Sequence, residues 1–163
     1  MPIEEALRRV ALHDCNTVCV TGGEPLAQKG CLTLLAALCD ADYSVSLETS
    51  GALSISGVDP RVAKIMDLKA PGSGESEKNL WSNLDHLNCA DEIKFVLASE
   101  ADYRWAKEIL EQKRLQDICP VLFSPVPGQL DAARLADWIL RDHLPVRFQL
   151  QLHKILWGSE RGR

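Results

Sequence analysis

Residues 18–25 read Val-Cys-Val-Thr-Gly-Gly-Glu-Pro, an apolar β-branched run that breaks into two glycines, a carboxylate and a proline. This order predicts a buried strand, a tight turn and a helix entry, because paired glycines allow positive φ and proline suits a first helical turn. Glu24 is then held at the carboxyl end of a strand, where parallel sheets bind their ligands. A carboxylate in that place favours a cationic amine. Taken alone, the stretch is equally compatible with a simple tight connection between a strand and a helix.

The length and composition predict one globular domain over residues 1–163. Hydrophobic residues make up 46% of the chain, which is enough to build a core. The net charge of −5, with no block of basic residues, argues against a nucleic-acid partner. No apolar run approaches the roughly 20 residues that span a bilayer, and the acidic start does not resemble a signal peptide. We therefore expect a cytoplasmic protein with no membrane partner.

Six cysteines are scattered through the chain, a distribution that favours free thiols over a disulfide framework in a reducing compartment. Cys15 and Cys19 form a C-x-x-x-C pair. Cys19 falls inside the predicted strand, however, and no third cysteine follows at a metal-ligand spacing. Cys31 and Cys39 are expected in the core of one helix. The sequence therefore assigns no metal site to residues of this chain.

Apolar strands alternate with helical patterns along the whole chain. Six strands are predicted to end near positions 21, 48, 69, 97, 124 and 152, and helical patterns cover 2–13, 31–41, 79–87, 101–115 and 130–142. Successive strand ends lie 21 to 28 residues apart, which is the length a strand and a crossover helix need. We predict an α/β fold with a parallel sheet and right-handed crossovers, and a loop over residues 72–78.

Polar or small residues follow each predicted strand, and the carboxyl ends of parallel strands share one edge of a sheet. We expect one rim to carry Thr21, Gly22, Gly23, Glu24, Glu48, Thr49, Ser50, Asp67, Lys69, Ser124, Gln151 and His153. The Glu48–Gly51 segment could instead be an ordinary turn, and Asp67 and Lys69 a solvated salt bridge. Lys94 enters the sheet's inner face or is exposed. The roles of Glu48 and Lys94 stay open.

Several enzyme classes lack a motif in this chain. There is no His-x-x-x-His, no defensible Ser-His-Asp order and no phosphate-binding Gly-x-x-x-x-Gly-Lys, so hydrolases and nucleoside triphosphatases find no support. The glycine-rich run at 72–75 follows a strand and could cradle an anion through its N–H groups.

Six motifs, in order over essentially the whole chain, resemble the 7-carboxy-7-deazaguanine synthases, radical S-adenosylmethionine enzymes of queuosine and 7-deazapurine biosynthesis. The motifs are Val-x-Val-Thr-Gly-Gly-Glu-Pro at 18–25, Leu-Glu-Thr-Ser-Gly at 47–51, Asp-Leu-Lys-x-Pro-Gly-Ser-Gly-Glu at 67–75, Glu-Ile-Lys-Phe-Val at 92–96, Phe-Ser-Pro at 123–125 and Gln-Leu-His-Lys-x-Leu-Trp-Gly at 151–158. The resemblance implies a partial (β/α) barrel of the radical S-adenosylmethionine type. It also implies a carbon–nitrogen lyase that contracts the ring of 6-carboxy-5,6,7,8-tetrahydropterin with loss of ammonia.

The resemblance also implies cofactors and binding residues. The family uses S-adenosylmethionine, a [4Fe-4S] cluster and Mg²⁺. The residues that match its S-adenosylmethionine site are Gly22, Gly23, Glu24, Ser50, Asp67, Leu68, Lys69, Ser124, Pro125, Val126 and Pro127. The residues that match its substrate site are Thr21, His153 and Arg163. A flavodoxin-like electron donor and a homodimer are further expectations.

The family's C-x-x-x-C-x-x-C cluster motif is the main departure, because it does not occur in this sequence. In the family it lies upstream of the helix that opens this chain, with the first strand and the Mg²⁺-binding threonine. We therefore expect the cluster and Mg²⁺ ligands upstream of Met1. One alternative is a cluster-less, inactive remnant that binds S-adenosylmethionine or a pterin. Another is a different radical S-adenosylmethionine enzyme such as an activase, which the motif at 151–158 disfavours.

Overall fold

The computed structural model describes residues 2–158 without the side chain of His153, and within them the chain forms a sheet of six strands. Every strand is parallel to its neighbours. The strands are β1 (Thr17–Val20), β2 (Ser44–Thr49), β3 (Ala63–Asp67), β4 (Glu92–Leu97), β5 (Val121–Pro125) and β6 (Arg147–Phe148). The α-helices are α1 (Ile3–Val10), α2 (Cys31–Asp40), α3 (Glu100–Lys113), α4 (Ala132–Arg141) and α5 (Leu152–Trp157).

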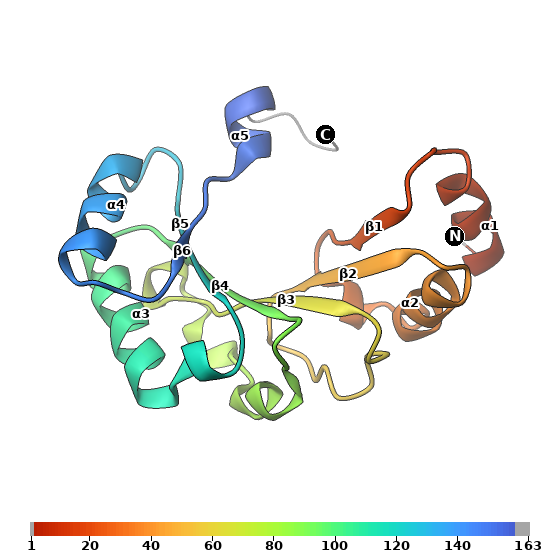
Figure 1. The fold of residues 1–163 in the computed structure, drawn as a ribbon, viewed down its shortest axis with the longest axis horizontal. Helices are drawn as coiled ribbons and strands as arrows, with labels where there is room; N and C mark the ends of the chain where they lie inside the picture. Colours follow the sequence, from red (N-terminus) through yellow and green to blue (C-terminus); the bar gives the residue numbers. More distant parts are fainter. Residues whose placement is uncertain (1, 159–163) are drawn as a thin grey trace.

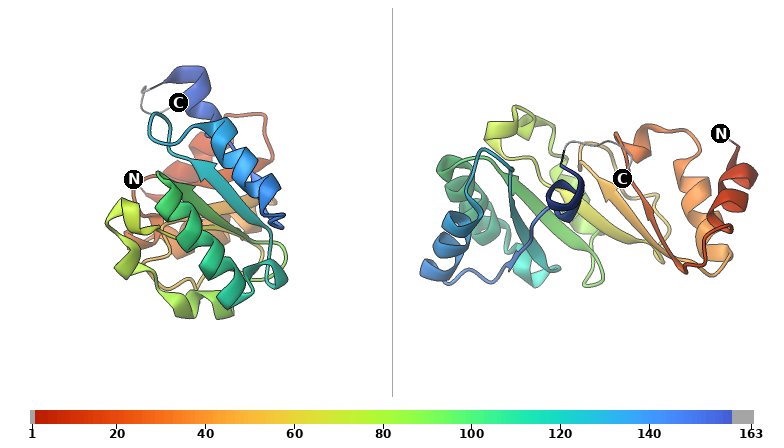
Figure 2. Two further views of the ribbon diagram at one scale, coloured as in Figure 1. Left: turned by 90° about the vertical axis from the view of Figure 1, so that its left-hand side faces the viewer. Right: turned by 90° about the horizontal axis from the view of Figure 1, so that it is seen from above.

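The strands occur in the sheet in the same order as in the chain. Right-handed crossovers between such strands place the connecting helices on one face. Figure 1 shows α2, α3 and α4 along the outer face of a curved sheet, with α5 on the other side. The view from above in Figure 2 shows the sheet open between β1 and β6. The predicted parallel α/β sheet is confirmed, as part of a barrel. Among the described helices, none combines the length and apolar character needed to cross a membrane.

Three predicted segments differ from the structure. The helical pattern at 79–87 forms only a 3₁₀ helix, η4 (Trp81–His86), and the predicted loop at 72–78 contains the 3₁₀ turns η2 (Pro71–Ser73) and η3 (Ser76–Lys78). The last strand, predicted to reach position 152, ends at Phe148. Its alternating leucines continue into α5, where residues 152, 155 and 156 follow helical spacing.

The core lies between the outer face of the sheet and the helices. Alternate residues of β4 (Ile93, Phe95 and Leu97) are fully buried there. The ring of Phe95 meets that of Phe123 edge-on, with centroids 5.4 Å apart, and that of Trp105 at 6.0 Å. These edge-to-face contacts fasten β4 and β5 to α3.

A buried ion pair closes the amino end of β3. The Lys64 ammonium lies 3.0 Å from Asp91 Oδ1, and the two side chains are 4% and 1% exposed. The Asp91 carboxylate also accepts the backbone N–H groups of Lys64 and Asn88, both at 2.8 Å. Asp91 therefore ties the start of β3 to the turn before β4.

We expect Phe95→Ala to lower the free energy of unfolding by about 3–5 kcal/mol, because it empties the centre of the aromatic cluster. Leu140→Ala is the control, since Leu140 is 71% exposed, and its effect should stay within about 0.5 kcal/mol. Urea denaturation at pH 7 measures both. Equal effects of the two substitutions would contradict this placement of the core.

Candidate active site at the carboxyl edge of the sheet

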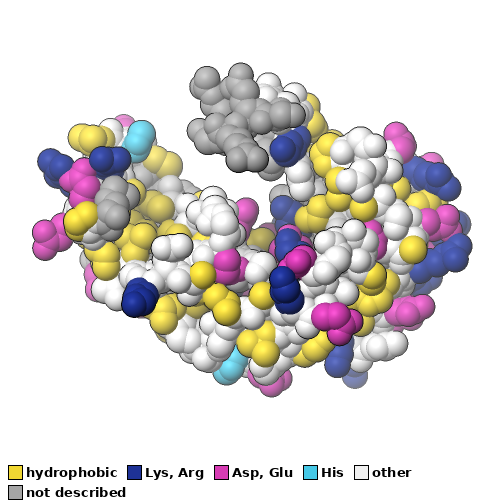
Figure 3. Space-filling view, turned by 180° about the vertical axis from the view of Figure 1, so that it is seen from behind, with side chains coloured by type: hydrophobic (Ala, Val, Ile, Leu, Met, Phe, Trp, Pro, Cys, Tyr) yellow, Lys and Arg dark blue, Asp and Glu magenta, His cyan; other side chains and the backbone are white. Residues whose placement is uncertain are grey.

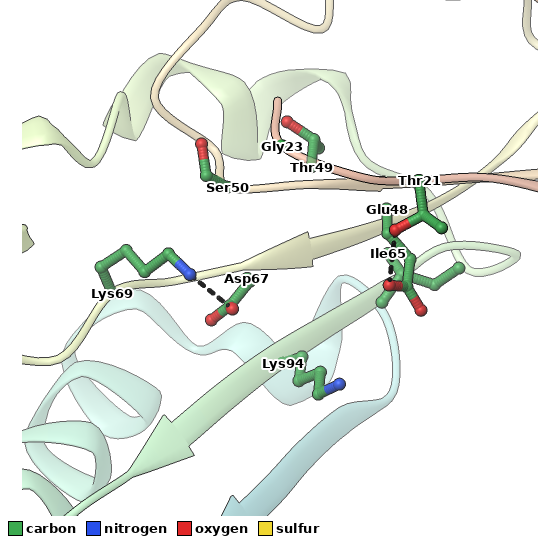
Figure 4. A pocket seen from close by; sticks show the side chains of 9 residues that line it. All are labelled: Thr21, Gly23, Glu48, Thr49, Ser50, Ile65, Asp67, Lys69 and Lys94. Atoms are coloured by element: carbon green, nitrogen blue, oxygen red, sulfur yellow. Dashed lines mark hydrogen bonds and ion pairs between the residues drawn. The ribbon is translucent and has the colours of Figure 1, made fainter. Parts of the chain in front are cut away.

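The inner face of the sheet is hollowed and polar at its carboxyl edge. Figure 3 shows the hollow from behind, with acidic and basic side chains at its base. A cavity of about 130 Å³ lies at this edge; its lining, labelled in Figure 4, is Thr21, Gly23, Glu48, Thr49, Ser50, Ile65, Asp67, Lys69 and Lys94. Most of the residues predicted from the first three strand ends therefore lie together.

Glu24 joins the end of β1 to the end of β2. Its carboxylate accepts hydrogen bonds from the Thr49 hydroxyl, from the N–H and the hydroxyl of Ser50, and from the Leu26 N–H. Burial raises the pKa of the Glu24 carboxyl, but these hydrogen bonds lower it by more, so that the pKa lies below the usual value of 4.5. Glu24 is ionised at neutral pH and adds negative charge beside the cavity.

The two glycines before Glu24 are required by backbone conformation. Gly22 and Gly23 have φ values of +99° and +56°, and a Cβ atom on either would meet nothing within 4 Å. Gly23 lines the cavity, whereas Gly22 does not. Pro25 opens the 3₁₀ helix η1 (Pro25–Ala27), so the predicted helical first turn is present but short.

Glu48 and Lys94 both face the hollow. The Thr21 hydroxyl donates to Glu48 Oε2 at 3.1 Å, as Figure 4 shows. Lys94 lines the same cavity and, with Glu48, an adjoining one of about 540 Å³ that extends to Phe148 and Gln151. Of the two positions open to Lys94, the structure therefore shows the inner face.

Two buried oxygen atoms near the rim have no hydrogen-bond partner among the described residues: Asp67 Oδ1 and Ser124 Oγ. The other Asp67 oxygen accepts from the Lys69 ammonium at 2.7 Å. Ser124 pairs in register with Val96, which lines a cavity of about 320 Å³ together with Asp67 and Lys69. Buried polar atoms are rarely left without a partner, so these two oxygens are candidates for contacts with a ligand or water.

The remaining predicted site residues are distributed as follows. Val126 lines the cavity of Asp67 and Lys69, and Pro125 and Pro127 line the neighbouring one, of about 480 Å³. Leu68 is fully buried in the core and lines none of these cavities, and its N–H donates to the Lys94 carbonyl. His153 belongs to α5 instead of following a strand, and its side chain lies outside the described part of the chain, as does Arg163.

Sequence reasoning missed residues that shape this edge. Ile65 and Gln129 line the cavities, and strand alternation beside Asp67 could have identified Ile65. Gln129 lies in the turn after β5, where the sequence gives no comparable signal.

The cysteines do not form a metal site. Cys15 and Cys19 are exposed free thiols, while Cys31 and Cys39 are buried in α2 as predicted. Across residues 2–158, no group of three or more His, Cys, Asp or Glu side chains is placed to hold a metal ion. The described residues therefore do not fit a [4Fe-4S] cluster or its ligand set.

Comparison with known proteins gives the family. No family model matches the chain. The 7-carboxy-7-deazaguanine synthase of Chlorobaculum tepidum is 50% identical over 163 residues, which cover 98% of this chain and 74% of that protein. The chain belongs to the 7-carboxy-7-deazaguanine synthase family. The protein of the same name from Koribacter versatilis is 41% identical over 86% of this chain and 69% of its own length.

Solved structures confirm the fold. QueE from Escherichia coli superposes with a TM-score of 0.73 at 20% identity, over 93% of this chain and 64% of that one. Streptococcus suis SuiB bound to S-adenosylmethionine gives a TM-score of 0.65 at 15% identity, over 93% of this chain and 42% of SuiB. The chain thus spans under two thirds of either structure. The family expected from the sequence is confirmed, and its lyase activity is favoured over an activase or a ligand-binding remnant.

We expect Glu24→Gln to lower the free energy of unfolding at pH 7 by about 1–3 kcal/mol, because an amide NH₂ would face donors that now meet a carboxylate. A folded-state pKa below 4.5 means that the carboxylate stabilises the fold above that pH. The difference from wild type should shrink as the pH falls below about 4 and Glu24 protonates. Urea titrations at pH 7 and pH 3 measure this difference, with Glu108→Gln on the exposed face of α3 as control. A difference that is the same at both pH values would refute the role of the charge.

Proposed function

We propose that this chain forms the S-adenosylmethionine and pterin site of a 7-carboxy-7-deazaguanine synthase, a lyase that converts 6-carboxy-5,6,7,8-tetrahydropterin to 7-carboxy-7-deazaguanine with loss of ammonia. One observation carries the proposal. The carboxylates of Glu48 and Asp67 and the ammonium groups of Lys69 and Lys94 converge on adjoining cavities at the carboxyl edge of the sheet, where Asp67 Oδ1 has no hydrogen-bond partner among the described residues.

The charges at this edge match the charges of S-adenosylmethionine. The molecule carries a sulfonium, an ammonium and a carboxylate. Glu24 and Asp67 supply negative charge for the cationic groups, and Lys69, which donates to Asp67 Oδ2 at 2.7 Å, keeps further N–H donors for the carboxylate. Asp67 Oδ1 can accept a hydrogen bond from a ligand hydroxyl or amino group, and the Ser124 hydroxyl can accept or donate one.

The pterin substrate is assigned to the adjoining part of the hollow. Glu48 and Lys94 are polar groups there, with Thr21 bonded to Glu48 in the smaller cavity, and Phe148 adds an apolar surface against which a flat ring can pack. His153 and Arg163 stay predicted substrate contacts. Bound in this way, the substrate would lie beside the S-adenosylmethionine cavity, which shares Glu48 and Lys94 with the larger one.

The radical chemistry of the family depends on a reduced [4Fe-4S] cluster, which supplies the electron that cleaves S-adenosylmethionine. Residues 2–158 offer no ligand set for the cluster. The cluster and Mg²⁺ would need ligands from outside these residues. A flavodoxin-like electron donor, a homodimer and a cytoplasmic location complete the proposal.

Binding is the first test. We expect S-adenosylmethionine to bind the chain in a calorimetric titration, and Ser124→Ala to weaken binding about tenfold through the lost hydroxyl. Stability without ligand should be unchanged or higher, because the variant removes an unpartnered buried oxygen. Ser44→Ala, at the exposed amino end of β2, is the matched control and should bind as wild type does. Absence of binding by the wild type would overturn the proposal.

Catalysis is the second test. A segment that carries three cluster cysteines is fused to the amino terminus of the chain, and the cluster is reconstituted anaerobically with iron and sulfide. The protein is then assayed with S-adenosylmethionine, the pterin and a reductant. Formation of 7-carboxy-7-deazaguanine is expected, and Lys69→Ala should reduce it at least about tenfold. A fully loaded cluster that gives no product would speak against a synthase.

A further inference from the structure

One side chain outside the cavities holds the backbone of a proposed site residue. Asn79 is 6% exposed and lines none of the cavities described above. Its Oδ1 accepts the Lys69 N–H at 2.9 Å, and its Nδ2 donates to the Lys69 carbonyl, also at 2.9 Å. Both backbone polar groups of Lys69 are therefore satisfied by one side chain.

The Asn79 amide replaces the hydrogen bonds of the sheet just beyond the end of β3. β3 ends at Asp67, and the Leu68 N–H still donates to the Lys94 carbonyl of β4 at 2.9 Å. At the next residue the side-chain amide of Asn79 provides the donor and acceptor that a strand would provide. A side-chain amide has the same paired groups as a peptide unit, which suits it to this substitution.

The position of the Lys69 backbone decides what its ammonium reaches. From this position Nζ lies 2.7 Å from Asp67 Oδ2, and Asp67 Oδ1 is left buried without a hydrogen-bond partner among the described residues. Lys69 thus neutralises one side of the carboxylate and leaves the other side for a ligand. Both residues line the two connected cavities at this edge.

We propose that Asn79 is a positioning residue for ligand binding, which acts through the Lys69–Asp67 pair without touching the ligand. The inference rests on the proposed function, because it takes these cavities to be the S-adenosylmethionine site.

A control substitution that acts on the opposite end of β3 separates an effect on positioning from a general effect on folding. Asp91 holds the backbone N–H of Lys64 at the amino end of β3, as Asn79 holds Lys69 at the carboxyl end. Asp91→Asn keeps an acceptor for that N–H but removes the charge that faces the buried Lys64 ammonium, so it lowers stability far from the cavities.

The experiment measures S-adenosylmethionine affinity by calorimetric titration of the full chain. We expect Asn79→Ala to weaken binding about tenfold and Asp91→Asn to change it less than about twofold. In a Lys69→Ala background, Asn79→Ala should add less than about a twofold loss, since the residue through which it acts is already altered. Wild-type affinity for Asn79→Ala, an equal loss in Asp91→Asn, or a full additional loss in the double variant would overturn the inference.

A measurement on the unaltered chain keeps the inference testable if Asn79→Ala does not fold. The Lys69 amide hydrogen, buried against Asn79 Oδ1 beyond the end of the sheet, should exchange with solvent deuterium at least about a hundredfold more slowly than an unprotected amide. Unprotected exchange would overturn the anchoring. A wild type that binds no S-adenosylmethionine would instead overturn the proposed function, whatever the exchange rate of Lys69.

Discussion

An all-parallel sheet needs cover on both faces, and in residues 2–158 the helices between strands cover only the outer face, while the inner face is buried at β5 and partly exposed at β3 and β4. The helices between strands all lie on the outer side, so that Phe95 and its alternating neighbours are buried there. The opposite face would expose apolar strands unless its residues were polar or a ligand covered them. Glu48, Asp67 and Lys94 lie on that face, and their charges gather where the strands end. The open sheet thus accounts for both the position and the polarity of the site.

The second constraint is that the loops at this edge must be held still without sheet partners. Buried side chains hold these loops by hydrogen bonds to their backbone groups. Asn83 accepts the Ile55 N–H and donates to the carbonyls of Gly51 and Leu53. Asp102, at the start of α3, accepts the N–H groups of Gly72 at 2.7 Å and Ala98 at 3.0 Å.

Asp102 also explains a glycine in the loop above it. A Cβ atom at Gly72 would lie 2.5 Å from an Asp102 oxygen, so the close approach of that loop requires glycine. Together with Glu24 and Asn79, these side chains fix the loop geometry before any ligand arrives, which is how binding sites keep the cost of reorganisation low.

The strands β1 to β5 and the edge that carries the site could be predicted from alternation and spacing, because both signals are local. The carboxyl-edge rule correctly placed Thr21, Ser50 and Lys69 around one cavity. Leu68 is assigned by the resemblance and not by this rule, and its side chain is buried in the core. The rule could not find Asn79 or Asp102, whose bonds reach 10 and 30 residues along the chain to groups that only the fold brings near.

Among the described residues, Asp67 Oδ1 and Ser124 Oγ are the buried side-chain polar atoms that have no hydrogen-bond partner. Leaving a buried polar atom unpaired destabilises a fold by about 1–3 kcal/mol. Replacing Ser124 by alanine would remove one unpaired buried oxygen and its free-energy cost with little steric change. The hydroxyl is therefore unfavourable for the stability of the ligand-free protein. Stability is commonly sacrificed in this way where a site awaits a ligand. Asp67 ends β3 and Ser124 lies in β5, with β4 between them, and Asp67 is paired with a lysine whose backbone a buried amide holds. A ligand that spans both oxygens would recover the missing hydrogen bonds, and that is the physical basis for assigning a polar, charged molecule to these cavities.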